Sequence, residues 1–295
     1  MPPDVPEKQP SAWRWVILAG LGFVSWISLA AILQAGIGPS PAEQYLSKKE
    51  VGKAEAEFEK IVRNAPNDPE SYLFVMKVCE KEGRLDIASK YLERALHACK
   101  DAPKPERALL YEQQTQILSV TEPKPKAQTL AAAQRAAALD PNSPNLLNTY
   151  GYLLADSLPQ GDPRLEEAVT VLSRALVLLK PDANPLNRFL NPKLELEKEQ
   201  LAPQAEDSYG WALYKQGKFD LAYNALSEAI SDSPKMTQSN KVAESAALKV
   251  LYYHLGAAAL KSGKKAEARR ALNTSLGYDK NYLEAKEAMA ELDKK

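Results

Sequence analysis

Residues that commonly carry metal or nucleophilic chemistry are scarce in this chain, which has two cysteines and two histidines. His97 and Cys99 are two residues apart, about 200° around a helix, so they cannot ligate one metal ion together. Cys79 and Cys99 fall near the ends of two successive antiparallel helices, beyond the roughly 7 Å between α-carbons that a disulfide tolerates. We therefore predict that both cysteines are small core residues.

Catalytic motifs are also missing from the sequence. It has no glycine-rich phosphate loop and no serine elbow, and the sequon at residues 273–275 lies in a helical pattern. The 38 basic residues balance the 38 acidic ones, so the chain lacks the basic surface that binds nucleic acid. The basic stretch at residues 261–270 is typical of a solvated turn. We expect no enzyme activity, no catalytic residue, no cofactor, no metal and no nucleic-acid partner.

The N-terminal segment has a different composition from the rest. Residues 15–42 contain no charged side chain, and residues 15–33 are almost wholly apolar. About 19 helical residues span the roughly 30 Å core of a bilayer, and Trp13 and Trp15 would lie at its interface. We predict a short polar tail at residues 1–12 and an uncleaved transmembrane helix at residues 13–36, in contact with the lipid bilayer.

Other membrane interpretations fit less well. A signal peptide has a shorter apolar stretch and small residues before its cleavage site, but the best site, after Ala35, is preceded by Leu33. A lipoprotein needs a cysteine directly after the apolar stretch, and the first one is Cys79. Arg14 borders the span on one side and no basic residue follows it closely, which favours repeats on the extracytoplasmic side of a single-pass membrane protein.

Beyond residue 41 the sequence is rich in Ala, Leu, Lys and Glu and repeats itself. The windows 72–99, 206–234 and 252–280 share one spacing of small and large residues. After the place of Gly210, a glycine follows 7 residues later, an alanine 12 later, a leucine 16 later and a small residue 19 later. Small residues at fixed places let two antiparallel helices approach closely, while the large ones fill the space between them.

This pattern resembles the tetratricopeptide repeat (TPR), a unit of two antiparallel helices. The resemblance implies an all-α TPR solenoid of helical hairpins, a right-handed superhelix, preceded by the transmembrane helix. About six units would cover residues 41–282, with insertions near 157–165 and 181–202 and a degenerate unit at 103–142. Residues 283–295 are predicted to form a capping helix over the last apolar face.

In that family, fixed places on the first helix of each unit line a concave groove that binds peptides. Carrying these places over gives a candidate protein-binding groove of seven residues: Asn148, Tyr152, Asp207, Trp211, Tyr214, Lys215 and Tyr253. Tyrosine and tryptophan are enriched in binding hot spots, although Trp211 could equally be a core residue. The places that clamp a chaperone carboxylate in some relatives hold Leu73 and Lys77 here, which does not match.

The resemblance thus implies a membrane-anchored adaptor or scaffold, in a bacterial envelope assembly, that binds a protein or peptide partner. One alternative is a chaperone-like holder of exported or translocating chains, with weak selectivity. Another is a structural protein that oligomerises through residues 181–202. The sequence leaves the partner and the oligomeric state open.

Overall fold

The computed structural model describes residues 39–121, 127–233 and 241–294, which form helices and turns without any strand. The predicted all-α class is confirmed for this part of the chain. In chain order the helices are α3 (Pro41–Ser47), α4 (Val51–Asn64), α5 (Pro69–Lys81), α6 (Leu85–Ala98), α7 (Lys104–Thr121), α8 (Ala127–Leu139), α9 (Pro144–Ser157), α10 (Leu165–Leu179), α11 (Pro185–Leu190), α12 (Pro192–Lys215), α13 (Phe219–Asp232), α14 (Lys241–Lys261), α15 (Lys265–Tyr278) and α16 (Leu283–Lys294).

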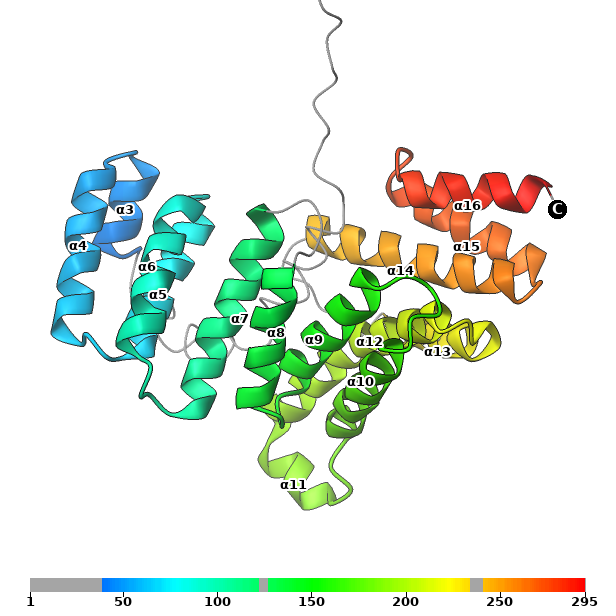
Figure 1. Ribbon diagram of the computed structural model, residues 1–295, viewed down its shortest axis with the longest axis horizontal. Helices are drawn as coiled ribbons and strands as arrows, with labels where there is room; N and C mark the ends of the chain where they lie inside the picture. Colours follow the sequence, from blue (N-terminus) through cyan, green and yellow to red (C-terminus); the bar gives the residue numbers. More distant parts are fainter. Residues whose placement is uncertain (1–38, 122–126, 234–240, 295) are drawn as a thin grey trace, which may run out of the picture.

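Successive helices pair as hairpins, and the hairpins stack side by side (Figure 1). The pairs are α3/α4, α5/α6, α7/α8, α9/α10, α12/α13 and α14/α15, and α16 packs on α14 and α15. The stack is bent, so that the α3–α6 end and the α14–α16 end rise on the same side of the view in Figure 1. The helical repeat solenoid expected from the sequence is therefore present in the described residues.

Sharp turns between the two helices of a hairpin need a left-handed residue. Gly83, Gly217 and Gly263 supply it, with φ of 69°, 79° and 75°, because glycine pays no steric cost in that conformation. Lys49 takes the same conformation between α3 and α4, with φ of 62°. The glycines that the repeat pattern singles out thus set the hairpin turns.

Within a hairpin, a glycine on the first helix lets a leucine of the second helix approach. A β-carbon added at Gly210 would lie 2.6 Å from Cγ of Leu226, which is closer than real contacts allow. Gly256 faces Leu272 in the same way, at 2.7 Å. This close packing fixes which side of each first helix faces its own second helix.

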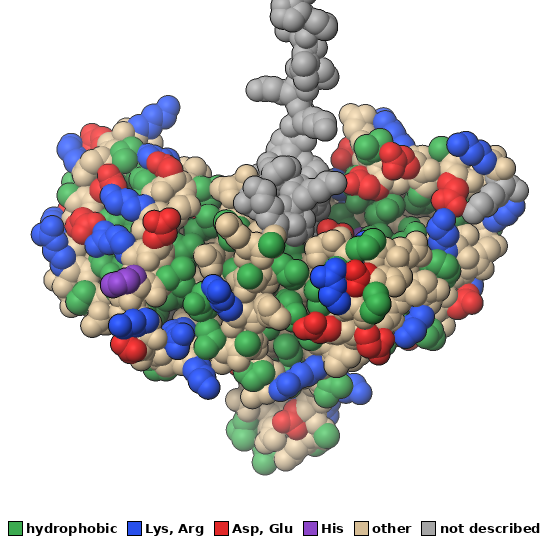
Figure 2. All heavy atoms as spheres, viewed as in Figure 1, with side chains coloured by type: hydrophobic (Ala, Val, Ile, Leu, Met, Phe, Trp, Pro, Cys, Tyr) green, Lys and Arg blue, Asp and Glu red, His purple; other side chains and the backbone are tan. Residues whose placement is uncertain are grey.

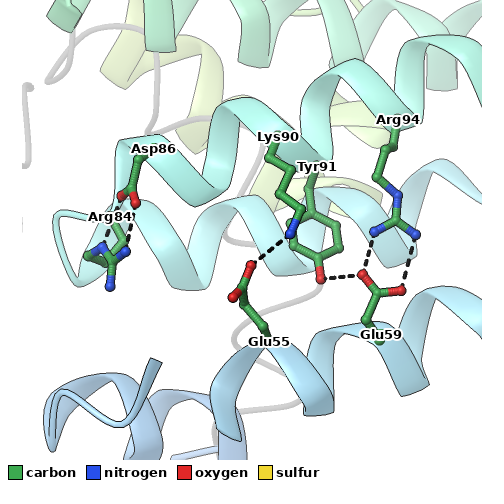
Figure 3. Close-up of polar contacts among 7 residues, drawn as sticks. All are labelled: Glu55, Glu59, Arg84, Asp86, Lys90, Tyr91 and Arg94. Carbon is green, nitrogen blue, oxygen red and sulfur yellow. Dashed lines mark hydrogen bonds and ion pairs between the residues drawn. The ribbon is translucent and has the colours of Figure 1, made fainter. Parts of the chain in front are cut away.

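Outer polar contacts join α4 to α6, the second helices of two neighbouring hairpins (Figure 3). The Tyr91 hydroxyl donates to Oε1 of Glu59 at 2.8 Å, and both terminal nitrogens of the Arg94 guanidinium bond the same carboxylate. Arg94 holds the pKa of Glu59 below its usual value. Lys90 pairs with Glu55 at 2.8 Å. These contacts fix the spacing of the hairpins on the outside of the solenoid.

Residues 181–202, expected as an insertion that breaks the repeat, are mostly helical. They form α11 and the start of α12, which continues through Pro203 as one helix of 24 residues. A proline inside a helix leaves the carbonyl four residues earlier without its donor. That carbonyl belongs to Glu199, an exposed residue, where water can bond it instead.

The predicted transmembrane helix, residues 13–36, lies outside the described residues. Among the helices that are described, none is both long enough and apolar enough to cross a bilayer. The longest, α12, carries Lys193, Glu195 and Glu197 within its first six residues. The predicted localisation, a single-pass membrane protein with extracytoplasmic repeats, is therefore wrong on the described helices.

Both cysteines are free and buried, as predicted from their placement. Burial raises the pKa of the Cys79 thiol to about 12 and that of Cys99 to about 11. Thiols with such pKa values are almost fully protonated at neutral pH and are poor nucleophiles.

Candidate functional site

The groove positions carried over from the repeat lie along one flank of the first helix of each hairpin. We call this flank of α5, α7, α9, α12 and α14 the inner face. Tyr152 and Asp156 of α9 interact electrostatically with Tyr282, the residue before α16. Packed helices lie about 10 Å apart, so a flat array would hold α9 and α16 far from each other. The first helices of this half therefore curl around a common centre.

Aromatic rings gather on this inner face. The Trp211 ring stacks on Tyr214, with centroids 4.9 Å apart and planes 8° from parallel, and on His254 at 4.1 Å and 15°. The ring centroid of Tyr253 lies 6.0 Å from that of Trp211 and 5.4 Å from that of Tyr282, which it meets edge-on. We call these five residues the aromatic cluster. It joins α12, α14 and the start of α16.

Two polar groups hold the aromatic cluster in place. Nδ1 of His254 lies 2.8 Å from Oδ1 of Asp207, and the imidazole is 3% exposed. A buried hydrogen bond of this kind fixes the plane of the ring that stacks on Trp211. Lys215 places Nζ 5.9 Å from the Trp211 ring centroid, and burial lowers the pKa of its ammonium.

The neighbouring loop orders the end of α12. The Gly161 amide donates to the Lys215 carbonyl at 2.8 Å, and the Gln216 side chain donates to Glu166 at 2.8 Å. Gly161 lies in the predicted insertion near residues 157–165, which thus connects α9 and α10 to α12. The residues that carry Trp211 and Tyr214 are consequently anchored from both sides.

Several buried polar atoms of the inner face have no hydrogen-bond partner. They are Oδ1 of Asn148, Oγ1 of Thr149 and Nε1 of Trp211. Asn148 and Trp211 are each 7% exposed, and Thr149 is 4% exposed. An unpaired buried polar group costs about 1–3 kcal/mol, so each of these atoms can still take a hydrogen bond from a water or from a bound molecule.

Carboxylates surround the aromatic cluster. Burial raises the pKa of Tyr152, Tyr253 and Tyr282, and nearby Asp156 raises each of them further. Glu284 and Glu287 on α16 act on Tyr253 in the same sense. Figure 2 shows Asp and Glu side chains gathered on the inward side of the α14–α16 end. The site is therefore aromatic and carries both signs of charge, since Nζ of Lys215 and Nζ of Lys249 lie 5.9 Å and 4.7 Å from the ring centroids of Trp211 and Tyr282. Such a site can stack on apolar side chains.

Five of the seven residues predicted from the sequence form a contiguous group: Asp207, Trp211, Tyr214, Lys215 and Tyr253. Tyr152 lies near them, since Asp207 and Tyr253 both affect the pKa of its hydroxyl. Asn148 is one turn before Tyr152 on α9, and no hydrogen bond joins it to the cluster. Trp211 is more buried than a groove residue was expected to be, and its ring nitrogen is buried as well.

Two residues of the site were not predicted. His254 was noted only as a rare residue type, although it follows a groove position directly. Tyr282 was placed at the end of the repeats, directly before the capping helix, and was not counted among the groove residues. A stacking partner adjacent in sequence to Tyr253 is a pattern that could have identified His254, whereas Tyr282 reaches the site only through the curvature of the solenoid.

Comparisons with known proteins agree with this fold. Residues 250–282 match the family model of the tetratricopeptide repeat. The structure is similar to that of YrrB, described as a TPR protein with an unusual peptide-binding site, with 15% identity and a TM-score of 0.50 over 79% of this chain and 97% of that one. It is also similar to the APC/C hetero-tetramer Cut9–Hcn1, with 18% identity and a TM-score of 0.54 over 84% of this chain and 41% of that one. No curated protein sequence matches the chain.

Proposed function

We propose that this chain, which has the fold of TPR proteins, binds a polypeptide segment along its inner face and acts as a protein-interaction adaptor. The observation that carries the proposal is that one buried acceptor and one buried donor near the aromatic cluster both lack a hydrogen-bond partner. Oδ1 of Asn148 lacks a donor and Nε1 of Trp211 lacks an acceptor. Every residue of a peptide backbone offers one N–H and one C=O.

The spacing of these two atoms suits an extended chain. The two atoms belong to α9 and α12, which are neighbouring packed helices with axes about 10 Å apart. An extended polypeptide covers this distance in about three residues. A peptide could therefore donate an amide to Asn148 and offer a carbonyl to Trp211 while its side chains stack on the aromatic cluster.

Fixed hydrogen-bonding groups favour a selective adaptor over a chaperone-like holder. A holder of many unfolded chains uses adaptable apolar surface, whereas the aromatic cluster is locked by the Asp207–His254 bond. A selective site enriches peptides with a shared sequence from a random library, while a holder enriches peptides that share only apolar composition.

The test is peptide selection on the full chain, followed by affinity measurements with the enriched peptide. Asn148→Ala and Trp211→Phe each remove one unpaired polar atom, and the second keeps an aromatic ring. We expect each variant to bind the peptide about 10-fold more weakly than wild type, which is the effect of losing one hydrogen bond in a site without water. Asn273→Ala, at an exposed asparagine on α15, is the control. Unchanged affinity in both variants would remove the basis of the proposal.

A further inference from the structure

A second polar cluster lies on the inner face nearer the N-terminal end, where α5, α7 and α9 meet. The Gln113 amide of α7 donates to Oε1 of Glu80 on α5. The Asn145 amide of α9 donates to Oε1 of Glu112 on α7 at 2.7 Å. Glu112 is 6% exposed and Asn145 7% exposed. Together with Lys77 of α5, these residues form what we call the carboxylate cluster.

The carboxylate cluster holds more negative than positive charge when both acids are ionised. Lys77 is the cation that acts on both Glu80 and Glu112, so two carboxylates share one ammonium. Burial raises the pKa of each carboxyl to about 7. Taking a charge out of water is costly unless an opposite charge joins it. A second cation would therefore be favourable at this place.

The hydrogen-bond balance points to the same kind of ligand. Oδ1 of Asn145 and Oδ1 of Asn148 have no partner, and both residues are more than nine-tenths buried. The Asn145 oxygen belongs to the planar amide whose nitrogen bonds Glu112, so it lies within the cluster. Asn148 follows three residues later on the same side of α9. What the site lacks is donors, and lysine and arginine side chains offer several donors with a positive charge.

We propose that Glu80, Glu112, Asn145 and Asn148 form a subsite for one cationic side chain, a lysine or an arginine, of the bound polypeptide. This inference rests on the proposed function and adds the chemistry of one ligand residue to it. Asn148 would then contact both the backbone of the peptide and its cationic side chain. It would thus connect this subsite to the aromatic cluster.

The distance between the subsite and the aromatic cluster also predicts how far apart in the peptide the cationic residue and the apolar or aromatic residue lie. Glu112 of α7 reaches α9 through its side-chain bond with Asn145, and α9 packs on α12, so Glu112 lies roughly two helix spacings of about 10 Å each from the aromatic cluster. An extended chain covers that distance in about six residues. The bound sequence should therefore carry a lysine or arginine about six residues from the apolar or aromatic residue that meets the aromatic cluster.

The experiment selects random peptides of about 16 residues, long enough to span both places in extended form, from phage displayed against the immobilised full chain. Wild type is expected to enrich one lysine or arginine at a fixed distance from an apolar residue. Glu112→Gln, which keeps the size of the side chain, is expected to lose that preference. Glu106→Gln removes a carboxylate elsewhere on α7 and should keep it.

Affinity measurements by fluorescence anisotropy complete the test with the enriched peptide and a version in which norleucine replaces its cationic residue. Glu112→Gln is expected to bind the cationic peptide about 10-fold more weakly than wild type, a typical effect for a hydrogen bond to a charged group. Both proteins should bind the norleucine peptide equally, which also shows that the variant is folded.

The outcomes separate the two proposals. If wild type enriches no shared sequence, the proposed function fails and the cationic subsite fails with it. If wild type enriches a shared sequence that lacks a lysine or arginine, or if Glu112→Gln keeps the preference for one, the peptide-binding function stands and the cationic subsite is refuted.

Discussion

Glu112→Gln should also change the stability of the free chain in a way that depends on pH. Glu112 is buried, and the pKa of its carboxyl is raised from 4.5 to about 7, chiefly by burial. Between these two pH values the folded chain holds a proton that the unfolded chain has released. Stability therefore falls as pH rises from about 5 to about 7 and stays at its lower value above that range.

The size of the effect follows from the shift. A pKa difference of about 2.5 corresponds to about 3 kcal/mol, at 1.36 kcal/mol for each unit. Glutamine carries no charge at any of these pH values, and its amide oxygen can still accept from Asn145. We expect Glu112→Gln to be more stable than wild type by less than about 1 kcal/mol at about pH 5 and by up to about 3 kcal/mol at about pH 8.5.

The assay is urea unfolding of both full-length proteins, followed by circular dichroism, at the two pH values. Subtracting the variant from wild type cancels the other groups that titrate in this range, including Glu80. Glu59→Gln is the matched control, because Arg94 lowers the pKa of Glu59. The contribution of Glu59 is lost only as pH falls through its folded pKa, so its difference from wild type should be constant between about pH 5 and 8.5. A difference for Glu112→Gln that does not change with pH would show that water reaches this carboxylate and that the carboxylate cluster is open.

Two further changes test the packing of the hairpins. Gly210→Ala puts a β-carbon 2.6 Å from Cγ of Leu226 and should cost about 1–3 kcal/mol in urea unfolding, whereas Gly52→Ala, with nothing within 4 Å, should be neutral or slightly stabilising; equal effects would contradict the close-approach argument. Tyr91→Phe removes the hydroxyl that donates to Glu59 and should lower the unfolding free energy by about 1 kcal/mol, and a variant as stable as wild type would show that this outer contact contributes nothing.

The hairpins could be predicted because their packing requires particular residue types at fixed intervals. A glycine facing a leucine, as at Gly210 and Leu226, leaves a pattern in the sequence that survives between units. The aromatic cluster was partly predictable for the same reason, since Trp211 and Tyr253 follow from the register of their units. Its hydrogen-bonded partner His254 was not, because a contact between two units has no fixed spacing along the chain.

The carboxylate cluster could not be found from the sequence. The unit at residues 103–142 lacks the glycine that marks the register, so nothing assigned Glu112 to the inner face. Asn145, which donates to Glu112, lies 33 residues away along the chain, and Glu80 lies 33 residues from its own donor Gln113. The path of α12 through Pro203 was missed for another reason. A proline in a helix pattern usually ends the helix, but here the carbonyl that loses its donor belongs to Glu199, an exposed residue.

Buried carboxylates of the inner face and exposed carboxylates of α16 should act on different steps of peptide binding. Glu287 on α16 is exposed, and at physiological salt such charges are screened beyond about 8 Å. Rim charges of this kind mainly set the association rate, while a buried charge pair mainly sets the dissociation rate. With the cationic peptide, surface plasmon resonance should show an association rate that falls with salt in wild type and is reduced in Glu287→Gln. The dissociation rate should rise in Glu112→Gln at every salt concentration, because a buried pair is screened much less. A dissociation rate that depends on salt as strongly as the association rate does would mean that the cation stays in solvent, outside the carboxylate cluster.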